Sequence, residues 1–414
     1  MSSDTFSAVG PSLDPRPTQT RFPDGINVVA LIVAAAMILI GGLWIADAVS
    51  GRQAALFLLG TLLGLVLYHA SFGFTSAWRV FISDRRGEGL RAQMIMLALA
   101  TALFFPALAS GSLFGQPVTG LVAPVGLSVV FGAFLFGMGM QMGGACASGT
   151  LYTVGGGSTR MLITLAAFVV GSTVGAYHLP WWSSQPSFQP VSLVKAWGPW
   201  AALAAHWFVF AGIYFATIWL ERRAHGRLLA KPAVTRHGLS RFSRGPWPVV
   251  VGALLLAILN FATLALAGRP WGITSAFALW GSKIAGGLGL ADVTKWTYWA
   301  SAERHAELTG GVLNDITSVM DIGIILGALL AAALAGRFAP NAMISARSAV
   351  AAIVGGLLLG YGARLAYGCN IGAYFSGIAS GSLHGWVWII AAFAGNVLGT
   401  RLRPMFGLEV ERTA

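Results

Sequence analysis

The chain has 414 residues, of which 56% are hydrophobic and only 10% are charged, and its formal net charge at pH 7 is +12. This composition excludes a soluble globular domain. Nucleic-acid binding is also excluded, because the basic residues lie mainly in a few connections between apolar runs. Two cysteines so far apart form neither a disulfide framework nor a zinc site, and no cofactor motif is evident. The sequence therefore predicts an all-α polytopic membrane protein.

Ten apolar runs are long enough to cross the hydrocarbon core of a bilayer as helices, which is about 30 Å thick. They cover residues 26–47, 54–71, 92–110, 121–141, 161–178, 199–220, 247–268, 317–336, 346–366 and 384–402. Residues 1–26 are polar and contain several prolines, which predicts a disordered tail. No cleavable signal is evident, because the first apolar run is itself long enough to span the membrane.

Four shorter apolar pieces cannot cross the bilayer as helices, and they occur at residues 72–82, 146–156, 271–284 and 370–380. We expect them to be re-entrant helices. Short, glycine-interrupted segments at matching points of two halves are typical of the binding site of a transporter.

The short pieces occur as two matched pairs. Phe72–Trp78 resembles Trp271–Phe277, since both contain Gly-x-Thr-Ser-Ala, and Gly137–Gly149 shares the pattern G-x-G-x6-C-x-x-G with Gly360–Gly372. Equivalent spans, such as the second and the seventh, are offset by five, an odd number, so re-entrant pieces would leave the second half inverted relative to the first. The predicted parts are a tail with an extra span (1–53), the first repeat (54–178), a linking span with a basic loop (179–246), the second repeat (247–402) and a C-terminal tail (403–414).

Arginine and lysine predict the orientation of the chain. If both termini are cytoplasmic, most basic residues fall inside, as the positive-inside rule requires. These residues are Arg79, Arg85, Arg86, Arg91, Arg160, Arg222, Arg223, Arg227, Lys231, Arg236, Arg241, Arg244, Arg337, Arg347, Arg401, Arg403 and Arg412. Residues 224–244 are then inside and 183–194 outside, with Arg52, Arg269 and Lys283 as exceptions on the outer side. The basic central loop also suits anionic membrane lipid.

The two cysteines, Cys146 and Cys369, occupy the same position in the two copies of the repeat. If each begins a short helix, the helix N-terminus favours a thiolate and any anion beside it. Two such helices entering from opposite faces would bring both thiols to the midplane, where sulfur suits a small, soft anion. The alternative is that each cysteine is a small hydrophobic residue packed against glycine.

These motifs resemble the YeeE/YedE family of sulfur-compound transporters, over roughly residues 54–402. The resemblance implies two inverted halves that form an hourglass, thiosulfate as substrate, and Cys146 and Cys369 in the neck. The second half looks most like the YedE branch, for which selenium-compound transport has been proposed. Family members of the thiosulfate type commonly have a third cysteine where this chain has Gly73.

Other candidate residues surround the two thiols. Arg364 either attracts the anion or pairs with an acid such as Asp321. Hydroxyl groups of the short pieces either donate to oxyanion oxygens or bond back into their own helices. The full set of candidate binding residues comprises Cys146, Cys369, Gly144, Gly149, Gly368, Asn370, Gly372, Arg364, Thr75, Ser76, Thr274 and Ser275.

The sequence thus predicts an inner-membrane importer of a small sulfur-containing anion, most simply thiosulfate. The alternatives are a transporter of a selenium compound or another sulfur species, a membrane thiol oxidoreductase or sulfurtransferase, and a channel or scaffold with packing cysteines. A small cytoplasmic sulfur-carrier protein is a candidate partner. No metal ion or other cofactor is expected.

Overall fold

The computed structural model describes residues 25–229, 238–340 and 344–411. Within these ranges, ten helices are long and apolar enough to cross a membrane, and each overlaps one of the ten predicted spans. They contain α1 (Val28–Ala48), α2 (Gly51–His69), α4 (Glu88–Ser110), α5 (Leu127–Gly143), α7 (Thr159–Ser183), α9 (Pro199–His225), α11 (Val249–Ala267), α14 (Ile316–Ala335), α15 (Ala346–Leu365) and α17 (Leu383–Leu402). Three of the candidate spans extend past these bounds, as Gly51–Asp84, Leu127–Gly155 and Leu383–Phe406. The prediction of an all-α polytopic membrane protein is confirmed. Most of the predicted N-terminal tail, together with Lys231, Arg236 and Arg412, lies outside the described residues.

Short helices occupy the four predicted short pieces. They are α3 (Phe74–Asp84), α6 (Ala147–Gly155), α12 (Thr274–Gly287) and the π-helix η4 (Asn370–Ser376), which continues into α16 (Gly377–Ala379). With 11, 9 and 14 residues, α3, α6 and α12 are shorter than the roughly 20 residues that a spanning helix needs. Their re-entry into the membrane stays a prediction.

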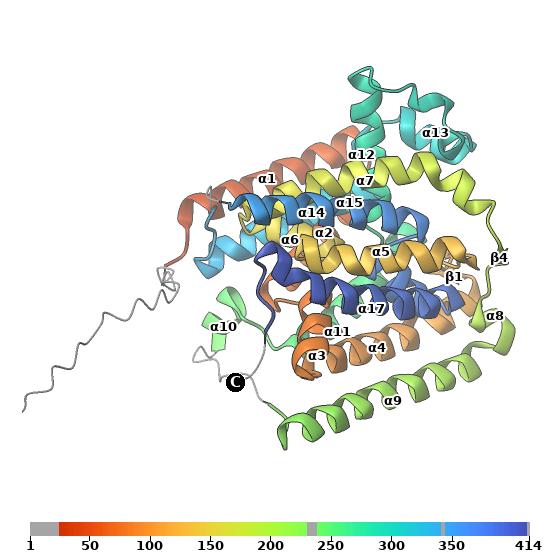
Figure 1. Cartoon of the computed structure of the whole chain (residues 1–414). Helices are drawn as coiled ribbons and strands as arrows, with labels where there is room; N and C mark the ends of the chain where they lie inside the picture. Colours follow the sequence, from red (N-terminus) through yellow and green to blue (C-terminus); the bar gives the residue numbers. More distant parts are fainter. Residues whose placement is uncertain (1–24, 230–237, 341–343, 412–414) are drawn as a thin grey trace, which may run out of the picture.

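The long helices lie side by side and define two ends of the molecule (Figure 1). One end carries β1 (Ser112–Leu113), β2 (Gln116–Pro117), β3 (Val125–Gly126), β4 (Ser187–Phe188) and α8 (Leu193–Trp197). We call it the β4 end. The opposite end carries α10 (Gly238–Arg244) and the segment after α17, which includes η5 (Arg403–Phe406), and we call it the α10 end. The strands pair as two short antiparallel ribbons, β1 with β2 and β3 with β4.

Helix packing follows a paired pattern. Helix α2 packs on α14 and α4 on α11, while α7 packs on α15 and α5 on α17. Because α11 and α14 are the repeat counterparts of α2 and α4, the α2–α14 and α4–α11 contacts are equivalent. The α7–α15 and α5–α17 contacts are equivalent in the same way, as expected for duplicated halves. The backbones approach closely at glycines: a Cβ atom on Gly64 of α2 would lie 2.1 Å from the carbonyl oxygen of Ile324 in α14. The inverted orientation of the halves and the predicted domain boundaries stay predictions.

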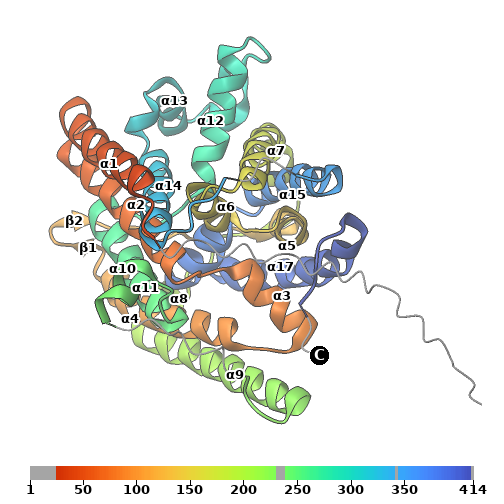
Figure 2. The same ribbon diagram turned by 90° about the vertical axis from the view of Figure 1, so that its left-hand side faces the viewer.

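Two helices lie at the periphery. Helix α1 packs on α2 and α14, and α9 packs on α4 and α8 (Figures 1 and 2). Both carry large exposed apolar side chains, among them Ile40 and Trp44 of α1 and Phe208 and Phe215 of α9. Such surfaces suit contact with lipid acyl chains.

The segment between α12 and α14 has more structure than its mixed charge suggested. It folds into η1 (Val293–Lys295), η2 (Thr297–Trp299), α13 (Ala302–Thr309) and η3 (Val312–Asn314). Its buried side chains Tyr298, Trp299 and Leu308 pack with Ala278 and Leu279 of α12. This separate apolar cluster explains why a segment rich in charged residues is ordered.

Candidate functional site

Cys146 is the residue from which α6 begins. Helix α5 ends at Gly143 and is capped by Gly144, whose φ of +93° is a conformation that favours glycine. The chain then turns into α6, with Cys146 as its N-cap. The Sγ atom accepts a hydrogen bond from the backbone N–H of Gly149 at 3.5 Å and lies 3.4 Å from Oγ of Ser148. The side chain is 1% exposed. The prediction that Cys146 starts a short helix is confirmed.

Cys369 has the same place in the second half. It follows Gly368, whose φ is +149°, and it is the N-cap of η4, where Sγ accepts from the backbone N–H of Ile371 at 3.4 Å. The residue is fully buried. The π-helix that follows is a wide turn of the kind often found at functional sites. A Cβ atom added at Gly372 would meet nothing within 4 Å, so open space lies directly beside this turn.

The two cysteine helices meet inside the molecule. Helix α6 contacts η4, and Cys146 lies close enough to Cys369 for the two side chains to interact electrostatically. Both are free thiols within one buried cluster. The N-termini of two short helices therefore converge on a pair of sulfur atoms, and their partial positive charges favour an anion there.

A pocket of about 290 Å³ lies near Cys369 toward the β4 end. Five predicted binding residues line it: Thr274, Ser275, Arg364, Gly368 and Gly372. Arg269, which the sequence analysis treated only as a topological exception, lines it as well. The pocket thus offers two guanidinium groups and hydroxyl groups to an anion.

A second pocket, of about 250 Å³, lies toward the α10 end and includes Gly73 and Ser76. These residues are the repeat counterparts of Gly272 and Ser275, which line the first pocket. The two Gly-x-Thr-Ser pieces therefore line pockets toward opposite ends of the molecule.

Some of the predicted binding residues carry polar atoms that have no partner. Among the described residues, the hydroxyl of Thr75 and both polar atoms of the Asn370 side chain are buried without a hydrogen-bond partner. Buried polar groups are normally satisfied, so such atoms point to a ligand or to bound water. Ser76 differs, because its hydroxyl bonds back to the carbonyl of Gly73 at 3.2 Å, as expected for a hydroxyl near a helix start. Ser275 Oγ instead lies 3.0 Å from Oγ1 of Thr317.

Arg364 has a partner that the sequence analysis did not consider. Its Nη1 donates to the hydroxyl of Tyr298 at 2.7 Å, and its guanidinium lies 5.6 Å from the centre of the same ring. The side chain of Asp321 has no hydrogen-bond partner among the described residues, so the suggested Arg364–Asp321 pair is wrong in this structure. Tyr298 belongs to η2, which lies 66 residues before Arg364 in the chain, and no local pattern marks the contact.

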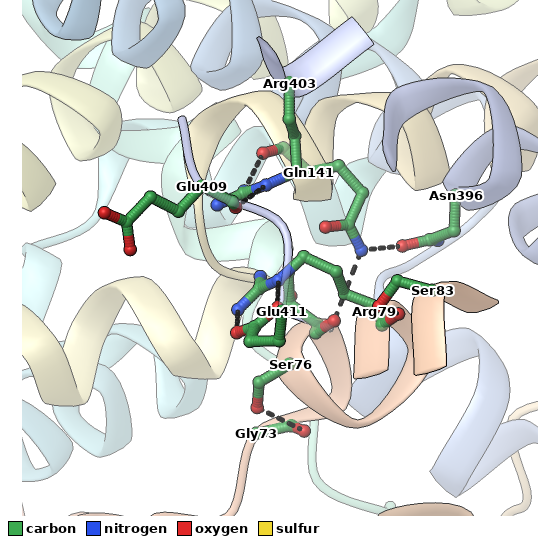
Figure 3. A network of polar contacts seen from close by, with 10 residues as sticks. Gly73, Ser76, Arg79, Ser83, Gln141, Asn396, Arg403, Glu409 and Glu411 are labelled. Atoms are coloured by element: carbon green, nitrogen blue, oxygen red, sulfur yellow. Dashed lines mark hydrogen bonds and ion pairs between the residues drawn. The ribbon is translucent and has the colours of Figure 1, made fainter. Parts of the chain in front are cut away.

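A polar network lies at the α10 end, and no sequence pattern indicated it (Figure 3). Gln141, the repeat counterpart of Arg364, donates to the side chain of Asn396 at 2.6 Å and to the carbonyl of Thr75 at 3.2 Å. The carbonyl of Gln141 accepts from Arg403 at 2.6 Å. Helix α3 is thus tied through Gln141 of α5 to α17.

The segment after α17 is tied to α3 by one ion pair. Arg79 binds the carboxylate of Glu411 with two bonds of 2.7 and 2.6 Å (Figure 3). The hydrogen bonds from Arg79 hold the pKa of Glu411 below its usual value. The last described residues therefore lie against the α10 end of the helix that carries Thr75.

Comparison with known proteins agrees with this architecture. The family described as sulphur transport matches residues 69–398. The chain belongs to this family. The resemblance recognised in the Gly-Cys motifs is thereby confirmed, and the ten apolar helices make this member a multi-pass membrane protein.

Two of the relatives span most of the chain, and a third spans less than half of it. It is 29% identical over 352 residues to the thiosulfate transporter TsuA of Spirochaeta thermophila, covering 82% of this chain and 95% of the relative. It is 26% identical to the thiosulfate transporter TsuA of Escherichia coli over 349 residues, which is 81% of this chain and 90% of the relative. The probable transporter YedE of Escherichia coli is 33% identical over 168 residues, or 40% of each chain.

Proposed function

We propose that this protein imports a small sulfur-containing anion, thiosulfate before others, into the cell across the inner membrane. The observation that carries the proposal is the convergence of two short helices, each capped by a free buried thiol, between pockets that lie toward opposite ends of the molecule. The names of the full-length relatives favour thiosulfate among sulfur anions.

The anion would enter from the β4 end. Arg269 and Arg364 line that pocket and offer positive charge, and Thr274 and Ser275 offer hydroxyl donors. Both are suited to replacing the water around the oxygen atoms of an oxyanion. The positive-inside rule favours this pocket as the outer one, with both termini in the cytoplasm.

At the neck, the two thiols would replace the hydroxyl and guanidinium groups as the contacts of the anion. The outer sulfur of thiosulfate is soft and weakly hydrated, so S–H donors of Cys146 and Cys369 replace its water at lower cost than they would replace water around a hard oxyanion. Thr75 and Asn370 have unused donors for the oxygen atoms. No bond to sulfur forms or breaks in this scheme. Because both thiols are buried, passage requires α6 or η4 to shift.

The test is uptake of ³⁵S-thiosulfate by proteoliposomes that contain the purified protein. We expect saturable uptake that unlabelled thiosulfate inhibits strongly and sulfate inhibits weakly. Selenium-containing and other sulfur-containing anions, added as competitors, establish the range of substrates. Liposomes without protein provide the control, and uptake no faster than in this control would contradict the proposal. A cytoplasmic sulfur-carrier partner stays a prediction, to be sought by copurification.

A further inference from the structure

Asp321 is a buried acid without a partner. It lies in the second turn of α14, its side chain is 0% exposed, and neither carboxyl oxygen has a hydrogen-bond partner among the described residues. Nothing in the thiol scheme above uses it. An ionisable side chain inside a membrane protein is costly to keep, which makes it a candidate for a functional role.

A second buried acid shows how a structural carboxylate is accommodated in the same molecule. Glu221 of α9 is also 0% exposed, but it accepts hydrogen bonds from Arg91 at 2.7 Å and from the backbone N–H groups of Gly87 and Leu229 at 3.0 and 2.9 Å. Asp321 has no such donors. An isolated buried carboxylate is far more costly than a neutral acid, so Asp321 carries a proton in this conformation.

Asp321 lies one helical turn behind the wall of the pocket toward the β4 end. Thr317 precedes it by four residues on α14 and therefore lies on the same helix face. The hydroxyl of Thr317 contacts Ser275 at 3.0 Å and Arg269 at 3.2 Å, and both of these residues line the pocket. Asp321 also lies near enough to Cys369 for an electrostatic interaction. It thus lies near both the pocket wall and one of the two thiols.

The charged surroundings do not stabilise an anionic Asp321. Titratable and charged groups occur on the elements packed against α14, and among the described residues none of them donates a hydrogen bond to Asp321. On the packed elements they are Asp47 of α1, Arg52, Tyr68 and His69 of α2, Cys146 and Tyr152 of α6, Arg241 and Arg244 of α10 and Lys283 of α12. Three further groups lie near this part of α14, namely Asp315 at its start, Arg269, which is 4.0 Å from the carboxylate of Asp315, and Cys369. Asp315 interacts with Asp321 as a like charge, which further favours the neutral acid.

We propose that Asp321 is a proton-binding site that couples anion import to the inward movement of a proton. This inference rests on the proposed function. An ionised Asp321 would repel an anion at the thiols, whereas the protonated acid would not, so binding of the anion and of the proton favour each other. Water reaching Asp321 from the β4 end supplies the proton to a carboxylate oxygen, and opening toward the α10 end releases the proton to water there. The proton also offsets part of the charge of a divalent anion that enters a cell with a negative interior.

The experiment follows thiosulfate and protons together in proteoliposomes that hold the full-length protein and a trapped pH-sensitive dye. In the wild type we expect thiosulfate entry to acidify the lumen. At a clamped membrane potential, one unit of pH gradient, acid outside, should raise the equilibrium accumulation of thiosulfate about tenfold per coupled proton. Asp321→Asn mimics the neutral acid. It should keep thiosulfate exchange between the two sides within about twofold, and lose both the acidification and the response to the gradient.

Glu221→Gln is the matched control, because it neutralises a buried acid that has partners and should leave the number of protons per anion unchanged. Wild-type uptake without proton movement would overturn the inference and leave the proposed function intact. Unchanged coupling in Asp321→Asn, or loss of exchange in a normally folded variant, would also overturn it. If Asp321→Asn fails to fold, Asp321→Glu is the variant that decides. It should keep the coupling of protons to thiosulfate but shift the pH dependence of uptake. An unshifted pH dependence would overturn the inference. Absence of uptake by the wild type in every condition would overturn this inference and the proposed function together.

Discussion

At the scale of single residues, the sulfur atoms of Cys146 and Cys369 have an unusual setting. Each accepts a backbone N–H at the start of a short helix, in the position that serine or aspartate usually occupies. Serine would cap these helices better than cysteine does. The use of cysteine at both N-caps therefore has no explanation in helix stability, and it favours a role in contacting a soft ligand.

We predict that Cys146→Ser and Cys369→Ser each fold normally and lose uptake by more than about tenfold, which corresponds to roughly 1.4 kcal/mol in the barrier. Serine retains the N-cap but presents a harder, better-hydrated hydroxyl to the anion. Initial rates of ³⁵S-thiosulfate uptake, normalised to protein in the membrane, measure this. Wild-type rates in the double variant would show that the cysteines serve packing alone.

Gly73 is the N-cap of α3, the same helix position that Cys146 and Cys369 occupy in α6 and η4. Its φ of −123° is accessible to any residue, and an added Cβ would lie 2.7 Å from the hydroxyl of Ser76, which can rotate away. We therefore predict that Gly73→Cys folds and that thiosulfate uptake is retained or increased. Yield and uptake measured on the same preparation test this.

Gly64 is a control glycine at which the same substitution is expected to impair folding. A Cβ on Gly64 would lie 2.1 Å from the backbone oxygen of Ile324, so Gly64→Cys should destabilise the α2–α14 contact by about 1–3 kcal/mol and lower the yield. A well-folded Gly73→Cys protein without uptake would contradict the view that a thiol is tolerated at this step of the path.

At the scale of elements, α3 is held by bonds that span the sequence. The side chain of Gln141 donates a hydrogen bond to the carbonyl of Thr75. The carboxylate of Glu411 accepts from Arg79, which lies 332 positions earlier in the chain. Helix α3 also carries the unpartnered hydroxyl of Thr75. Movement of α3 therefore depends on contacts that lie at the α10 end.

We predict that low pH releases the segment after α17 from α3. Arg79 lowers the pKa of Glu411, so the ion pair stabilises the attached state above the usual pKa of glutamate, and this stabilisation is lost as the pH falls through the lowered value. The Glu411 side chain is 40% exposed, which limits the effect to less than about 1 kcal/mol. Glu411→Gln should shift the segment toward the detached state at pH 7 by up to about fivefold, and distances between spin labels on α3 and residue 408 measure this shift. Equal distances in the variant and the wild type would contradict this role of the pair.

The elements themselves were largely predictable. Ten apolar runs gave ten helices, and the Gly-Cys motifs correctly placed the starts of α6 and η4, because glycine, N-cap and hydropathy patterns are local. The ordered segment that holds Tyr298, the Arg364–Tyr298 bond and the isolation of Asp321 were not predictable. Each depends on which residues lie opposite one another after folding, and a single sequence carries no record of those contacts.

At the scale of the whole molecule, the paired packing of α2 with α14 and α4 with α11 is the pattern that two copies of one unit produce. Equivalent pockets lie toward opposite ends, with Gly272 and Ser275 in one and Gly73 and Ser76 in the other. An alternating exposure of the thiols to these pockets would need only small, similar shifts in the two halves. Such a mechanism requires the ends to face opposite sides of the membrane.

We predict that the β4 end faces the outside and the α10 end the cytoplasm. Gln189 and Ala224 are exposed at the two ends and lie in segments whose content of basic residues differs as the positive-inside rule requires. In intact cells, a membrane-impermeant maleimide should label Gln189→Cys, and it should label Ala224→Cys only after the membrane is opened. The native thiols give little background, because both are buried. Labelling of both positions from the same side would contradict the predicted topology and, with it, the inverted arrangement of the halves. The reverse pattern would keep the two halves inverted but make the pocket with Arg269 and Arg364 the cytoplasmic one.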